Sequence, residues 1–277
     1  MNPDNSKGWR RYHGQMRIEQ LGDGVPEVAV VGSIHGDEPC GRDGIEAVLA
    51  DPPEIERPVK FIIANEAALE ANQRYLDTDL NRSFPGDADS ESRETRLAAA
   101  ITSELRDCTV LSLHSTQSYD GMFALVDELT PEMETLCSSL SVDAVVQTKG
   151  ANEGRMIATV DSVLEVECGY QGSPEAAENA EQVIREFLAA TGVTAESPPQ
   201  RDTSLPVFQL GEPIPKATAE QYEVFVRNFE PVPEGDPVAA ADDETVVAEE
   251  PFHPVLLSAY GYEDVFGFTA DRIGVLE

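Results

Sequence analysis

A histidine and two carboxylates follow directly on an apolar run near the start of the chain. Residues 28–34 predict a buried strand, and His35, Gly36, Asp37 and Glu38 come immediately after it. A His and a Glu three residues apart, on a turn that enters a helix, can point the same way and could bind a metal ion. The alternative is an ordinary polar turn that caps the helix.

A second histidine closes another apolar run, "TVLSLH", which ends at His114. In α/β sheets, ligands gather at the carboxyl ends of the strands. Two His and one Glu from separate elements form a donor set that leaves zinc a fourth, open position. Alone, His114 is as well explained by a hydrogen-bonded histidine at a strand end, but its placement together with His35 and Glu38 favours a metal centre.

The segment "RYLDTDLNRSFPG", residues 74–86, concentrates charge between two predicted elements. One of its guanidinium groups, Arg74 or Arg82, could grip a carboxylate with two hydrogen bonds. The other could stabilise a developing oxyanion. Without the other candidate residues, a salt-bridged surface loop would explain this segment equally well.

Two carboxylates lie in the predicted strand "LEVEC". Glu165 and Glu167 point to the same face, because side chains alternate along a strand. A carboxylate inside a sheet is costly unless it is paired or functional. At a strand end it could act as a general base that activates water. The alternative is a glutamate of an edge strand that faces solvent.

Strand-like and helix-like segments alternate over residues 28–191 and would position these groups. This alternation predicts an α/β domain whose central sheet is flanked by helices. The predicted strands are 28–34, 59–64, 109–114, 122–126, 142–148 and 162–168, and the predicted helices are 39–50, 92–105, 131–140 and 174–191.

The texture of the sequence changes after residue 194. A Pro- and Ser-rich linker covers residues 196–206, followed by short strand candidates separated by turn residues and by an acidic loop at 239–250. These strand candidates are residues 207–210, 222–229, 254–260 and 264–269. We therefore predict a catalytic α/β domain over residues 1–195 and a small β-rich C-terminal domain over residues 200–277.

The charge is strongly acidic, with 52 Asp and Glu against 19 Lys and Arg and a net charge of −33. A surface that binds nucleic acid needs the opposite sign, so we expect no nucleic-acid partner. Acidic residues spread along the whole chain are typical of proteins from high-salt cytosols, where screening removes most of the self-repulsion. We interpret this charge as a halophilic adaptation.

Several patterns bear on location. No apolar stretch is long enough for a transmembrane helix, so no membrane partner is expected. The N-terminal residues lack the apolar region of a secretory signal. The four cysteines are far apart, which favours reduced thiols and a cytoplasmic protein.

Taken together, the motifs GxxHGDE, RYxDxDLNRxF, LH and ExECGxQG occur in this order and resemble the aspartoacylase and succinylglutamate desuccinylase family. That family belongs to the zinc carboxypeptidase-like superfamily, whose fold has a mixed central sheet flanked by helices. The resemblance covers about residues 28–190. The C-terminal part is similar only in its general β-rich character.

The resemblance implies a role for each motif. His35, Glu38 and His114 would bind one Zn²⁺ ion per chain. Glu167 would be the general base and then the general acid, a role for which Glu165 is less suited.

The resemblance also implies groups that contact the substrate or support the ligands. These are Arg74, which would polarise the scissile carbonyl; Asn81 and Arg82, which would hold a substrate carboxylate; Asp79, which would support a metal ligand; Arg155, a further substrate contact whose spacing from Glu167 differs from the family's; and a C-terminal tyrosine, Tyr260 or Tyr262.

One residue departs from the family pattern. Family members often have Asp two residues before the second His, whereas this chain has Ser112. We therefore expect the surroundings of His114 to differ from the family's, with a cost in metal affinity.

These residues together predict a zinc-dependent amidohydrolase that deacylates a small acidic N-acyl amino acid. Two alternatives remain from the sequence. One is a metallocarboxypeptidase that acts on peptides with the same metal and arginine positions. The other is a non-catalytic zinc-binding domain, against which the presence of both Glu167 and Arg74 argues. The sequence does not predict an oligomeric state.

Overall fold

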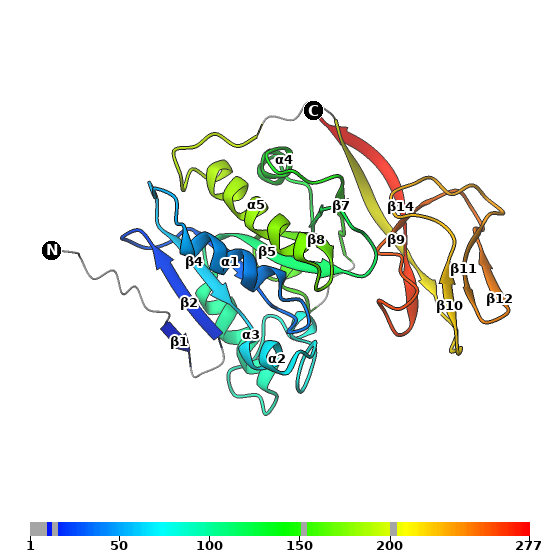
Figure 1. Ribbon diagram of the computed structural model, residues 1–277, viewed down its shortest axis with the longest axis horizontal. Coiled ribbons are helices and arrows are strands. Elements are labelled where there is room, and N and C mark those ends of the chain that lie inside the picture. Colours follow the sequence, from blue (N-terminus) through cyan, green and yellow to red (C-terminus); the bar gives the residue numbers. More distant parts are fainter. Residues whose placement is uncertain (1–9, 13–15, 151–153, 200–203) are drawn as a thin grey trace.

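A large mixed sheet runs through the structure, a computed structural model that describes residues 10–12, 16–150, 154–199 and 204–277 (Figure 1). Eleven strands form this sheet in the order β1-β2-β4-β3-β5-β8-β6-β7-β9-β14-β13. A smaller sheet at one end has the order β10-β11-β12. The predicted fold, a mixed α/β sheet flanked by helices with a β-rich C-terminal part, is confirmed.

The strands of the large sheet include four parallel neighbours, β4, β3, β5 and β8, at its centre. Strand β6 is antiparallel to β8, which makes the sheet mixed. The bounds in sheet order are β1 Arg10–Tyr12, β2 Met16–Leu21, β4 Val59–Ile63, β3 Val28–Gly32, β5 Thr109–Thr116, β8 Ser162–Tyr170, β6 Phe123–Val126, β7 Val145–Gln147, β9 Leu205–Pro215, β14 Val265–Leu276 and β13 His253–Val255.

Helices cover both faces of the sheet. Helices α1 (Cys40–Ala50), α4 (Pro131–Ser138) and α5 (Pro174–Ala190) pack on one face, and α3 (Arg93–Glu104) packs on the other. The short elements are α2 (Glu66–Ala71) and the 3₁₀ helices η1 (Leu80–Arg82) and η2 (Met156–Ala158). Each helical face contributes apolar residues to a separate core cluster, so the central strands of the sheet are buried on both sides.

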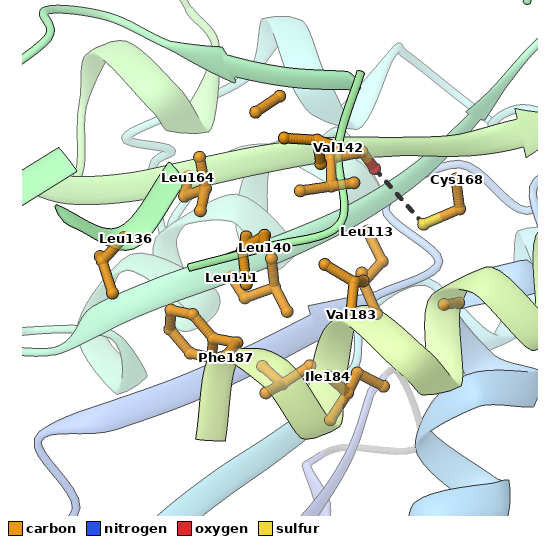
Figure 2. Packing of buried hydrophobic residues seen from close by; sticks show 14 of the residues in the cluster. Leu111, Leu113, Leu136, Leu140, Val142, Leu164, Cys168, Val183, Ile184 and Phe187 are labelled. Atoms are coloured by element: carbon orange, nitrogen blue, oxygen red, sulfur yellow. Dashed lines mark hydrogen bonds between the residues drawn. The ribbon is translucent and has the colours of Figure 1, made fainter. Parts of the chain in front are cut away.

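The alternation of side chains along β5 and β8 separates core from chemistry. Leu111, Leu113 and Leu164 point toward α5, where they pack with residues such as Phe187 (Figure 2). Since successive side chains alternate, His114 and its neighbours on β8 point toward the opposite face, which α3 covers. The polar residues of β5 and β8 that are predicted to carry function therefore share one face of the sheet.

The C-terminal part has its own apolar cluster. Strands β9 and β14 form a long antiparallel pair that joins the large sheet through β7, and β10 (Tyr222–Val224), β11 (Pro237–Ala241) and β12 (Glu244–Val247) form the small sheet. Val238, Phe252 and Phe266 contribute to the cluster there. The division into domains at residues 195–200 stays a prediction, and residues 200–203 of the predicted linker lie outside the described residues.

Three predictions about the C-terminal part were wrong. The strand expected at 222–229 ends at Val224. The acidic loop expected at residues 239–250 holds the end of β11 and all of β12, because Ala239 and Ala241 are small enough to pack into the local core despite the surrounding charge. The strand expected at 254–260 ends at Val255, because the next residue, Leu256, has a positive φ of 56° that a strand cannot adopt.

Among the described residues, no helix is long and apolar enough to cross a membrane.

Replacement of a core residue tests the packing of α5 on the sheet. Phe187 is fully buried, so Phe187→Ala should lower the free energy of unfolding by about 3–5 kcal/mol through lost burial and the cavity left behind. Val25→Ala, at a position that is 85% exposed, is the control and should stay within about 0.5 kcal/mol of the wild type. Denaturant unfolding of both variants measures this difference, and equal effects would contradict the assigned packing.

Candidate active site

The turn after β3 carries His35 and Glu38 to the carboxyl edge of the parallel strands. Gly36 lies between them against α2, and any side chain there would collide with the backbone of Ala68. Its amide donates a hydrogen bond to the carbonyl oxygen of Arg74 at 3.2 Å. Only glycine therefore allows this turn to pack between α2 and the segment that carries Arg74.

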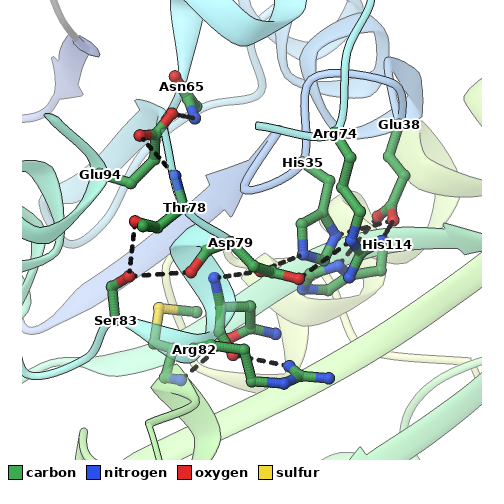
Figure 3. Close-up of polar contacts among 12 residues, drawn as sticks. His35, Glu38, Asn65, Arg74, Thr78, Asp79, Arg82, Ser83, Glu94 and His114 are labelled. Atoms are coloured by element: carbon green, nitrogen blue, oxygen red, sulfur yellow. Dashed lines mark hydrogen bonds and ion pairs between the residues drawn. The ribbon is translucent and has the colours of Figure 1, made fainter. Parts of the chain in front are cut away.

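The structure brings His35, Glu38 and His114 together (Figure 3). The two carboxylate oxygens of Glu38 lie 2.8 Å from Nδ1 of His35 and 3.0 Å from Nδ1 of His114. One ligand atom from each residue lies within 4.8 Å of the others. The side chains come from two strand ends that are far apart in the sequence, as the sequence analysis expected.

The far nitrogen of each imidazole also has a partner. Nε2 of His35 lies 3.3 Å from Oδ1 of Asp79, and Nε2 of His114 lies 3.2 Å from Oγ of Ser112. Such contacts fix the ring orientation and leave Nδ1 directed at the shared point. Two imidazole nitrogens and a carboxylate in a buried position are a donor set that suits Zn²⁺, so the residues present fit a metal ion.

Burial and charge oppose one another at these residues. Burial would raise the pKa of Glu38, but the two histidines hold it well below its ordinary value. Burial would lower the pKa of His35, but Glu38 and the hydrogen bond to Asp79 raise it. The site therefore favours an ionised carboxylate at its centre.

Arg74 reaches the same centre from the loop after α2. Its Nη1 donates to Oε1 of Glu38 at 3.2 Å, and its Nε donates to Oδ2 of Asp79 at 3.1 Å. Burial would lower the pKa of Arg74, but these two carboxylates raise it. Its side chain is 38% exposed, so it stands between the buried site and solvent.

A buried carboxylate that sequence reasoning missed shapes this loop. Glu94, on α3, is fully buried and accepts hydrogen bonds from the amides of Leu76, Asp77 and Thr78 at 2.9, 3.1 and 3.3 Å. Figure 3 shows the contact with Thr78. The three amides lie between Arg74 and Asp79. No sequence pattern could have identified Glu94, because it lies in the first turn of a helix, where acidic residues are common.

Glu167 and Glu165 lie on β8 beside the residues of β5. In the parallel register, Glu167 is the partner of His114 and Glu165 is the partner of Ser112. Burial, with Glu38 and Glu165 nearby, raises the pKa of Glu167. One of its oxygens, Oε2, is buried without a hydrogen-bond partner in the part of the chain that the structure describes. That oxygen is free to take a proton.

Arg82 and Arg155 converge beside this site. The oxygen of the Asn81 side chain accepts a hydrogen bond from the amide of Met156 at 3.0 Å, which docks the residues around Arg155 on η1. Burial, together with the neighbouring charge of Arg155, lowers the pKa of Arg82. Asn81 is buried and here supports the backbone, and its predicted contact with substrate stays a prediction.

The two candidate tyrosines lie differently. Burial, with Glu167 close by, raises the pKa of Tyr262 to about 12, so this tyrosine lies near the site. Lys216 holds its backbone, donating to the carbonyl oxygen of Tyr262 at 2.7 Å while resting on the ring of Tyr222. Tyr260 is 62% exposed and lines another cleft with Tyr170, which none of the proposed metal ligands lines.

Comparison with known families gives one match that covers most of the α/β part. A sequence model of the succinylglutamate desuccinylase/aspartoacylase catalytic domain matches residues 24–191. The chain is 24% identical to a probable aspartoacylase from Nostoc sp. over 86% of this chain and 92% of that protein. It is 34% identical to an N-acyl-aromatic-L-amino acid amidohydrolase (carboxylate-forming) from Xenopus laevis over 37% of this chain and 38% of the relative.

Solved structures show the same fold. Murine aminoacylase 3 aligns with a TM-score of 0.71 and 20% identity, over 92% of this chain and 98% of that one. The product-bound ectoine utilization protein EutE (DoeB) from Ruegeria pomeroyi aligns with a TM-score of 0.75 and 18% identity, over 92% and 88% of the two chains.

The role of Glu94 gives a test of how the Arg74 loop is held. Glu94→Gln keeps the shape of the side chain but replaces one acceptor oxygen with an NH₂ donor, which faces buried amide N–H groups. This change should lower the free energy of unfolding by about 1–3 kcal/mol. Hydrogen exchange at Leu76, Asp77 and Thr78 should quicken. Glu91→Gln removes the same charge from an exposed position and is the control. Unchanged exchange at the three amides would contradict this role.

Proposed function

Since the chain belongs to the succinylglutamate desuccinylase/aspartoacylase family, we propose that it is a zinc-dependent hydrolase that cleaves the amide bond of an N-acyl amino acid. The observation that carries the proposal is the buried meeting of His35, Glu38 and His114 beside Glu167. The printed names of the relatives, aspartoacylase and N-acyl-amino-acid amidohydrolase, support the same reaction class.

Three residues would hold the ion. Nδ1 of His35, Nδ1 of His114 and the carboxylate of Glu38 are its proposed ligands. When bound, zinc supplies a Lewis acid that makes water acidic and polarises a carbonyl oxygen. Asp79 and Ser112 would keep the two imidazole rings oriented, because each contacts the far nitrogen of one ring.

Glu167 is the proposed general base. Its side chain shares a face with His114 and carries a buried oxygen without a partner among the described residues. It would accept a proton from the attacking water and then deliver it to the nitrogen of the leaving amine. Its raised pKa suits both steps, because a carboxyl group that titrates nearer neutrality can accept and return a proton.

Arg74 is proposed to stabilise the oxyanion that forms on the scissile carbonyl. A guanidinium has five N–H donors, so the contacts with Glu38 and Asp79 leave donors for a substrate oxygen. The same contacts fix the group in place before substrate binds, and fixed donors cost no reorganisation during the reaction.

Arg82 and Arg155 are proposed to bind the carboxylate of the substrate. Burial and, after it, the charge of Arg155 lower the pKa of Arg82, and an anion between the two guanidinium groups would relieve their repulsion. Tyr262 lies close enough for Arg155 to influence its pKa, so we propose it as a further substrate contact. Two guanidinium groups in a chain of net charge −33 favour a small acidic acyl amino acid.

We further propose that residues 1–195 form the catalytic domain and residues 200–277 a covering domain. The separate apolar cluster of the C-terminal part supports this division. The acidic composition supports a high-salt cytoplasm as the working environment, where salt would mute repulsion of an acidic substrate.

Metal removal tests the proposed reaction. Dialysis against a chelator should abolish turnover, and stoichiometric Zn²⁺ should restore it, because the proposed reaction needs a metal ion to make water acidic. Turnover is assayed at high salt with N-acetyl-aspartate, N-succinyl-glutamate, N-acetylated aromatic amino acids and peptides cleaved at their C-terminus. Turnover of peptides alone would favour a carboxypeptidase, and zinc binding without any turnover would favour a non-catalytic domain.

Glu167→Gln tests the general base. The variant should retain zinc but lose about 10²- to 10⁴-fold in kcat, the usual worth of a positioned acid–base group. Glu178→Gln, on the exposed side of α5, is the matched control and should keep full activity. Full turnover by a zinc-loaded Glu167→Gln variant would remove Glu167 from the mechanism.

A further inference from the structure

We propose that Glu165 is a positioning residue for His114, and that it supports the metal ligand from the neighbouring strand. The carboxylate of Glu165 would accept a hydrogen bond from Nε2–H of His114, the ring nitrogen that faces away from the metal. Ser112 would share this contact with the same nitrogen. This inference rests on the proposed metal-dependent function and extends it to a residue outside the proposed ligands and catalytic groups.

The register of the sheet places Glu165 behind the ring. Ser112 and Glu165 are direct partners on the parallel strands β5 and β8, so their side chains emerge on the same face. Nε2 of His114 lies 3.2 Å from Oγ of Ser112 and 4.0 Å from Oε1 of Glu165. Both groups therefore face the same nitrogen.

The two edges of the imidazole ring have different partners. Nδ1 of His114 lies 3.0 Å from Glu38, whereas Nε2 faces Glu165. Since the two nitrogens of an imidazole point in different directions, Glu165 cannot join Glu38 as a ligand on the Nδ1 side. Its position suits a group that acts through the ring.

The burial of Glu165 needs an explanation that the fold alone does not supply. Its side chain is 7% exposed, and Oε1 has no hydrogen-bond partner within the described part of the chain. A buried carboxylate without a partner is costly. A histidine whose Nδ1 binds a divalent cation keeps its proton on Nε2 and becomes a stronger donor, which gives Glu165 the partner that it lacks.

His35 has the same arrangement. Its Nδ1 faces Glu38, and its Nε2 lies 3.3 Å from a carboxylate oxygen of Asp79. Glu165 would therefore complete a matching pair, in which each ligand imidazole has a carboxylate at its far nitrogen. Asp79 comes from the loop before η1 and Glu165 from the strand beside β5, so the two supports arise from different parts of the fold.

The affinity for zinc tests this role directly. Chelator competition should give Glu165→Gln a zinc dissociation constant about 10- to 100-fold above the wild-type value, as for other carboxylates that orient a ligand histidine. Glu178→Gln removes the same charge from an exposed site and should leave the constant unchanged. Ser112→Asp/Glu165→Gln moves the carboxylate to β5 and should recover most of the lost affinity.

Thermal unfolding separates a positioning role from a structural one. In metal-free protein, Oε1 of Glu165 is buried without a hydrogen-bond partner among the described residues, so Glu165→Gln should be at least as stable as the wild type. With zinc bound, the variant should be less stable than the wild type. A merely structural residue would instead destabilise both forms equally.

Two results would overturn the inference alone: a Glu165→Gln variant that binds zinc as tightly as the wild type, or one that loses equal stability with and without metal. A wild-type chain that binds no zinc would overturn the proposed function, and this inference with it. Because zinc affinity is measured without substrate, loss of activity for another reason does not affect the outcome.

Discussion

One carboxylate lies at the centre of the site, where two imidazoles share it in a buried place. Glu38 contacts Nδ1 of both His35 and His114, and the three side chains are almost completely removed from solvent. Such a group is costly unless positive charge compensates it. Arg74 supplies part of that charge, and a divalent cation would supply the rest. The surrounding loops serve to hold these few donors within reach of one another.

The parallel sheet makes this meeting possible. Neighbouring strands β3, β5 and β8 end at the same edge, and alternation along β5 and β8 gives each strand an apolar face and a polar one. Leucines on one face pack on α5, while two cross-strand pairs lie on the other face, His114 with Glu167 and Ser112 with Glu165. The first pair places Glu167 beside the proposed ligand His114. The second pair places Glu165 behind the ring of His114. Ser112 therefore has a carboxylate, Glu165, as its neighbour on the next strand.

Sequence patterns predicted most of the α/β fold and the meeting of His35, Glu38 and His114, because strand ends and hydrophobic periodicity are local signals. They could not predict contacts set by tertiary packing. Glu94 accepts hydrogen bonds from three backbone amides of the loop that carries Arg74, and Lys216 holds the backbone of Tyr262. Which of Tyr260 and Tyr262 lies near the site depends on the loop that follows β13. That loop begins at Leu256, inside the segment that was predicted to be a strand. The acidic composition of residues 239–250 is typical of an exposed loop, so it gave no signal for the end of β11 or for β12.

Anomalous diffraction at the zinc edge, from crystals of the zinc-loaded protein, would locate the ion. We expect one strong peak per chain, about 2.0–2.2 Å from Nδ1 of His35, Nδ1 of His114 and an oxygen of Glu38. A map without a peak among these three side chains, or with its only peak elsewhere in the molecule, would contradict this expectation.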